Sequence, residues 1–207
     1  MKNTTESSLF SVSGLVLSAL YLIVGLATLY FVLTRAFPYL SYSYSEKAYG
    51  KDAVLIFSHV IFGITATILG PFQFVSSIRK RNIKLHRNLG KTYLICTILG
   101  ALASWAIIIP RTDSDITYQV GLFSLGFVWI GSAIMAYLSI KNKKIELHRE
   151  WVVRSYVITL AFVTFRLIYD LLEPMQIKGT GALMAWACWA LPLFVTELIL
   201  QGRKIYK

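Results

Sequence analysis

Six long apolar blocks constrain the fold of this chain more than any other feature of its sequence. Each block approaches the roughly 20 residues that an α-helix needs to cross a bilayer core of about 30 Å. Hydrophobic residues make up 56% of the chain, against about 45–50% apolar residues in soluble domains. The pattern predicts an all-α integral membrane protein, a single domain over residues 1–207, with six transmembrane helices at Ser13–Leu33, Ala53–Val75, Thr92–Ile109, Tyr118–Ile140, Trp151–Leu172 and Gly181–Leu200.

The basic residues are distributed unevenly between the two sides that such helices would define. Fifteen of the 21 Lys and Arg fall on one side, together with both chain ends, and only five lie in loops on the other side. The positive-inside rule then predicts cytoplasmic termini (N-in/C-in) in a bacterial inner membrane. The net charge of +11 would attract anionic lipid headgroups. No nucleic-acid-binding module accompanies it, so we expect no nucleic-acid partner.

The sequence contains an internal repeat. "SIRKRNIKLHR" from Ser77 aligns without a gap with "SIKNKKIELHR" from Ser139. Both copies follow an apolar block and precede another, which predicts a parallel repeat of residues 53–109 and 118–172. The repeat would form a four-helix core, with residues 13–33 and 181–200 outside it. It also places His86 and His148 at equal depth.

Polar and small residues recur at helical spacing after each of these two histidines. Because lipid-facing stripes should be aliphatic, both stripes are expected to face the interior of the bundle. The first stripe is Gly90, Tyr93, Thr97 and Ser104, and the second is Ser155, Thr159, Phe162 and Arg166.

An inner polar centre is predicted where His86, Arg87, His148 and Arg149 meet near the cytoplasmic side, and Glu197 could join them. Two facing histidines could ligate the iron of one b-type haem as a metal site, with the arginines beside its propionates. A quinone or a lipid headgroup could occupy the same place. Alternatively, these residues only anchor helix ends at the membrane boundary.

An outer polar centre is predicted from His59, Arg166 and Asp170. An arginine inside a span is costly and is usually retained for a function. Asp170, one turn beyond Arg166, is its expected ion-pair partner. The centre could be a structural pair, the pocket of a small transporter or anion-binding module, a proton path, or half of a second cofactor site.

The sequence lacks the motifs that are typical of several enzyme classes. HExxH, GxSxG, P-loop and GxGxxG patterns are all absent, and three histidines divided between two sides cannot share one zinc ion. No catalytic residue is therefore assigned. The best interpretation is a membrane redox protein binding haem or quinone, and a transporter, a lipid-binding module or a structural subunit are the alternatives.

Two family resemblances bear on these residues. "HVIFGITATILGPFQF" from His59, "LHRNLGKTY" ending at Tyr93, and "LHREWVVRSYVITLAFVTFRL" from Leu147 resemble a bacterial membrane family, domain of unknown function 2306. The positions of the histidines are also similar to the cytochrome b561 superfamily, which holds two b haems between four helices. His86 and His148 would match one ligand pair there. The fourth apolar block has no histidine, so that resemblance implies at most one haem.

Overall fold

A computed structural model describes residues 12–41, 43, 46–47, 50–111, 115–176 and 179–205. Helices dominate this part of the chain, and none of the described residues forms a β-strand. Six helical segments are long and apolar enough to cross a membrane. The all-α fold class and the six spanning helices are therefore confirmed. The helices are α1 (Val12–Phe31), α3 (Ala53–Leu69), α4 (Ser76–Arg81), α5 (Ile83–Ile108), α6 (Ile116–Lys141), α7 (Ile145–Thr159), α8 (Ala161–Leu172) and α9 (Thr180–Ile205).

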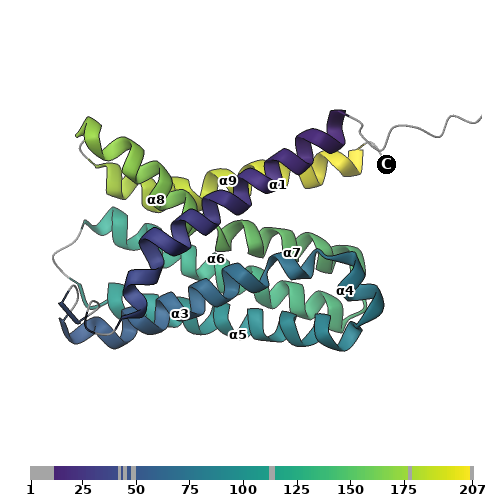
Figure 1. The fold of residues 1–207 in the computed structure, drawn as a ribbon, viewed down its shortest axis with the longest axis horizontal. Coiled ribbons are helices and arrows are strands. Elements are labelled where there is room, and N and C mark those ends of the chain that lie inside the picture. Colours follow the sequence, from purple (N-terminus) through teal and green to yellow (C-terminus); the bar gives the residue numbers. More distant parts are fainter. Residues whose placement is uncertain are drawn as a thin grey trace, which may run out of the picture.

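Four of these helices form a closed bundle. Contacts run from α3 to α5, from α5 to α6 and from α6 to α7, and α7 returns to contact α3. Helices α5 and α7 therefore occupy one diagonal of the bundle. Helix α9 packs against α6, α7 and α8, and α1 packs against α8. Figure 1 shows α8 and α9 beside the bundle and α1 crossing diagonally from near the end of α9 toward α3.

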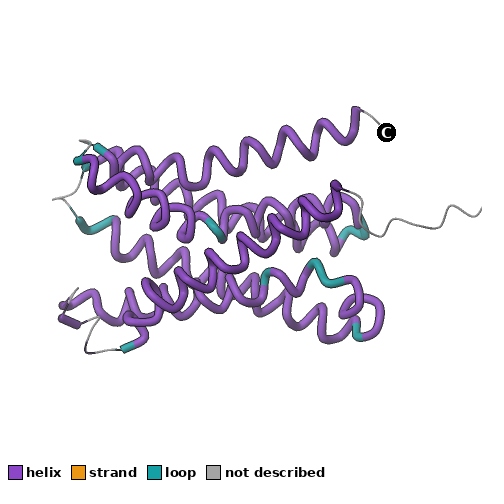
Figure 2. The backbone as a smooth tube through the Cα atoms, turned by 45° about the horizontal axis from the view of Figure 1, so that its top comes forward, coloured by secondary structure: helices purple, strands orange, loops and turns teal. Residues whose placement is uncertain are grey.

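The helices run roughly along one direction, and their connections gather at two ends (Figure 2). Helix α4, the start of α1 and the end of α9 lie at the same end in Figure 1. We call this the basic end, because it also carries the Lys- and Arg-rich connections that follow α3 and α6. The opposite end carries the short helical turns Phe37–Leu40, Gly50–Asp52 and Glu173–Met175.

Helices α5 and α7 begin earlier than their apolar blocks predicted. They start at Ile83 and Ile145 rather than at Thr92 and Trp151. The Asn82 side chain caps α5 by accepting a hydrogen bond of 2.9 Å from the Leu85 amide, as N-cap residues do. Apolar composition marks only the part of a helix that faces hydrocarbon, so the polar first turns were missed.

The helix predicted over Trp151–Leu172 is interrupted at Leu160, where α7 ends and α8 diverges from the bundle (Figure 1). Just before the break, the Thr159 hydroxyl donates to the Ser155 carbonyl at 2.9 Å. A Thr hydroxyl bonded to the carbonyl one turn back competes with the backbone ladder and often bends a helix. The break turns α8 toward α1 and α9, which it contacts.

Gly70, directly after α3, lies against the Tyr156 side chain of α7. A Cβ atom there would lie 2.2 Å from Cδ2 of the Tyr156 ring. This ring also packs on Phe74 at 5.8 Å, and its hydroxyl donates to the Thr67 carbonyl at 3.4 Å. Gly63, in α3, has nothing within 4 Å of such a Cβ.

These two glycines give a matched prediction. We expect Gly70→Ala to lower the free energy of unfolding in detergent micelles by about 1–3 kcal/mol through overpacking. Gly63→Ala should raise it, by up to about 1 kcal/mol, because alanine is the better helix former. Equal effects of the two substitutions would contradict the close contact at Gly70.

Candidate functional site

An inner cavity of about 690 Å³ lies near the basic end of the bundle. Its walls come mainly from α5, α6 and α7, with Gln73 and Phe74 after α3 closing one side. None of its lining residues is acidic. All four residues of the predicted inner centre line it, and its cationic side chains are Arg79, Arg87, Lys91, Lys141 and Arg149.

The two histidines of this cavity occupy equivalent positions on the diagonal helices. His86 is the fourth residue of α5 and His148 the fourth residue of α7, and both are half-buried. Nδ1 of His148 lies 2.8 Å from the Ala136 carbonyl oxygen. A carbonyl only accepts, so Nδ1 carries a proton, and in the neutral ring Nε2 keeps its lone pair. Nδ1 of His86 is buried with no partner among the described residues.

A second buried polar atom of this cavity also lacks a partner. Nε2 of Gln73 has no hydrogen bond among the described residues. The Gln73 side chain lies over Gly90, where a Cβ would be 3.0 Å from Oε1. Because Gly90 follows His86 by one helical turn, the two unsatisfied nitrogens belong to the same wall. Buried polar groups normally have partners, so a ligand with oxygen acceptors would complete this wall.

The charges at this cavity are poorly balanced within the protein. Arg149 forms an ion pair with Glu146 at 2.6 Å. Arg79 and Arg87 form no ion pair within the described part of the chain. The cavity is therefore apolar in its walls and strongly cationic at its edge.

A buried polar layer separates this cavity from a second one. The Tyr93 hydroxyl lies 2.9 Å from the Ser155 hydroxyl and 2.7 Å from the Thr159 hydroxyl. The Trp129 indole donates to the Thr159 hydroxyl oxygen at 2.8 Å. Tyr93, Thr97, Ser155 and Thr159 are buried, as their helical stripes predicted. Tyr93 and Ser155 line the inner cavity, whereas Trp129 lines the other.

The direction of each hydrogen bond in the polar layer follows from its partners. Thr159 gives its proton to the Ser155 carbonyl, so its oxygen accepts from both Trp129 and Tyr93. The Tyr93 oxygen then accepts from the Ser155 hydroxyl. An indole N–H only donates, so the chain of bonds ends at Trp129. The layer therefore lies between the two cavities, with Tyr93 and Ser155 on the inner side and Trp129 on the outer side.

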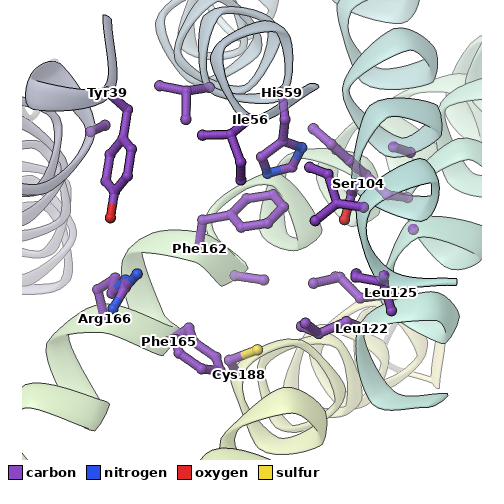
Figure 3. A pocket seen from close by; sticks show the side chains of 18 of the residues that line it. Tyr39, Ile56, His59, Ser104, Leu122, Leu125, Phe162, Phe165, Arg166 and Cys188 are labelled. Atoms are coloured by element: carbon purple, nitrogen blue, oxygen red, sulfur yellow. The ribbon is translucent and has the colours of Figure 1, made fainter. Parts of the chain in front are cut away.

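The outer cavity, of about 290 Å³, lies on the other side of the polar layer. Figure 3 shows His59 and Arg166 on its boundary, with Phe162 of α8 between them and Phe165 on the side of Arg166 away from His59. Nδ1 of His59 lies 2.8 Å from the Gly100 carbonyl oxygen, which fixes the ring against α5. The ring also meets Phe162 edge-on, at 5.3 Å between centroids.

The predicted ion pair between Arg166 and Asp170 is wrong. Asp170 instead forms an ion pair with Arg35 at 2.5 Å. Arg35 lies in the π-helical turn Val32–Ala36 that follows α1. Pairs four residues apart on one helix contribute only about 0.2–0.5 kcal/mol, so a cation from another helix can displace them. Asp170 does not line the outer cavity, whereas Arg35 and Arg166 do.

A further charged cluster connects α7 to α9 and was not predicted. Arg154 is 6% exposed and forms ion pairs with Glu197 and with Glu150, the latter at 3.3 Å. Lys204 also binds Glu150, at 2.8 Å. From its sequence position, Arg154 is one of the fifteen basic residues predicted to lie on the cytoplasmic side. The only local signal was Glu150, four residues earlier on the same helix.

The fold and its two cavities define a multi-pass α-helical membrane protein. Residues 56–200 match the family described as predicted membrane protein (DUF2306), and the chain belongs to this family. No curated protein and no solved structure matches the chain. The similarity to the cytochrome b561 superfamily thus finds no support in these comparisons. No group of three or more His, Cys, Asp or Glu among the described residues could hold a metal ion.

Proposed function

We propose that this protein binds an anionic amphipathic ligand in the inner cavity, near the basic end. The observation that carries this proposal is an apolar cavity of about 690 Å³ whose lining includes five cationic side chains and no acidic one. An apolar body with a carboxylate or phosphate group matches both properties. A neutral quinone would fill the cavity but leave Arg79 and Arg87, which form no ion pair among the described residues, without counter-charges.

Specific groups would hold each part of such a ligand. Arg79 and Arg87, which have no ion-pair partner among the described residues, would bind the anionic group. Hydrogen bonds to charged groups contribute about 1.5–3 kcal/mol each. The unsatisfied nitrogens of Gln73 and His86 would bind ligand oxygens. The apolar body would then lie against Phe74 and Leu94.

A b-type haem is one ligand with this chemistry, since its apolar ring bears two propionates. His148 would suit a ligand to the haem iron, because ligating histidines donate their other ring N–H to a second partner, here the Ala136 carbonyl. His86 faces the same cavity from α5 but has no such second partner. When bound, haem would supply one-electron transfer. An anionic phospholipid also combines an apolar body with an anionic group. Its binding would not require either histidine to act as a metal ligand.

The experiment that tests the proposal is identification of the ligand that copurifies with the protein from haem-replete cells. A Soret band that disappears in both His86→Ala and His148→Ala would assign a haem. A colourless protein that carries an anionic phospholipid in native mass spectra would assign a lipid. A protein that carries neither, or only a neutral quinone, would contradict the proposal.

A further inference from the structure

We propose that the outer cavity is a separate binding site for a small monocarboxylate with an apolar body, held by Arg166. This site lies on the far side of the polar layer from the inner cavity. It does not depend on what the inner cavity binds. The inference rests on the charges, the walls and the size of the outer cavity.

One of the three arginines that line the outer cavity has no ion pair among the described side chains. Three arginines line it and no acidic residue does. Arg35 is paired with Asp170 at 2.5 Å, and Arg111 with Asp52 at 3.6 Å. Arg166 forms no ion pair with any acidic side chain that the structure describes, although it lies within the span Ile145–Leu172. An uncompensated charge inside a membrane is costly, and a ligand with a single negative charge would balance it.

The walls match an apolar or aromatic body. Phe162 and Phe165 of α8 and Leu122 and Leu125 of α6 surround the open centre of the cavity in Figure 3, with Arg166 at its edge. The planar guanidinium of arginine binds a carboxylate through two parallel hydrogen bonds. The Tyr39 hydroxyl points to the same side of the cavity as Arg166 (Figure 3).

The volume and the charge of the outer cavity restrict the class of ligand further. A volume of about 290 Å³ is at the lower end of small-molecule pockets, about 300–1,000 Å³. A long acyl chain or a large headgroup therefore does not fit. His59 donates through Nδ1 to the Gly100 carbonyl, and Arg166 is the one lining arginine without an ion pair among the described side chains. A monoanion thus fits this cavity better than a dianion.

The test uses benzoate as the probe and calorimetric titration of the full chain in nanodiscs of uncharged phosphatidylcholine. We expect saturable binding of benzoate and at least tenfold weaker binding of benzamide, its uncharged analogue. Arg166→Gln should weaken benzoate binding at least tenfold. Arg203→Gln, which removes an exposed cation at the end of α9, should leave it unchanged.

A second variant keeps the test decisive if Arg166→Gln fails to fold. Ser104→Phe retains Arg166 and fills part of the cavity that Ser104 lines, so it should also abolish benzoate binding. The proposal is overturned if the wild-type chain gives no saturable binding, if benzamide binds as well as benzoate, or if Arg166→Gln binds benzoate normally. Displacement of benzoate by an equal concentration of chloride would also overturn it, since the apolar body would then contribute nothing.

Discussion

Changing Arg79 and Arg87 together to glutamate should weaken binding of an anionic ligand in the inner cavity by at least about 100-fold. The two arginines line that cavity and form no ion pair among the described residues. Losing two hydrogen bonds to a charged group costs about 3–6 kcal/mol, and each 1.4 kcal/mol is about tenfold in affinity. Titration with short-chain phosphatidylglycerol and with haemin measures the change.

A matched control comes from the same segment. Lys80 and Lys84 are exposed and do not line the cavity, so Lys80→Glu with Lys84→Glu changes the net charge equally. Any effect on membrane orientation through the positive-inside rule is therefore shared by both double variants. Binding should remain within about threefold of wild type in the control, because exposed charges are screened by salt. Equal losses in the two double variants would show that net charge, rather than this cavity, binds the ligand.

Replacing Glu197 by alanine should lower the free energy of unfolding by about 1–3 kcal/mol, the cost of depriving a buried polar group of a partner, because Arg154 is buried while the Glu197 side chain is 37% exposed. Arg154 is buried and binds Glu197 of α9. Its guanidinium carbon also lies 4.7 Å from the ring centroid of Trp151. Without Glu197, Arg154 retains only Glu150, which Lys204 shares. Equilibrium unfolding in mixed detergent and SDS micelles measures the free energy.

The control for this loss is an exposed pair on the same helix. Arg149 and Glu146 form an ion pair at 2.6 Å, but their side chains are 52% and 75% exposed. Glu146→Ala should therefore change stability by less than about 1 kcal/mol. If Glu146→Ala and Glu197→Ala were equally mild, the connection between α7 and α9 would not depend on the Arg154 cluster.

Much of the architecture follows from the sequence because length and repetition are local properties. A run of about 20 apolar residues has few alternatives to a spanning helix. The duplicated LHR segment predicts that His86 and His148 occupy matching turns, and the structure has each as the fourth residue of its helix. Helical spacing likewise predicts that Tyr93 and Thr159 face inward, and both are buried.

The remainder depends on contacts between distant segments. Asp170 follows Arg166 by one turn, yet Arg35, 135 residues away in sequence, binds it. Arg154 is buried because Glu197 approaches it from α9. The unsatisfied nitrogen of Gln73 depends on the turn Pro71–Gln73 bringing that side chain over Gly90. No pattern in a single sequence specifies such pairings, since each depends on where another helix packs.

An experimental density map of the protein, purified with its native lipids and cofactors, tests the proposed ligand most directly. We predict continuous density in the inner cavity, between α5 and α7, with an anionic group beside Arg79 and Arg87 and an oxygen within hydrogen-bond distance of Gln73 Nε2. An inner cavity that contains only ordered water, or that collapses so that Gln73 and His86 bond to other protein groups, would contradict it.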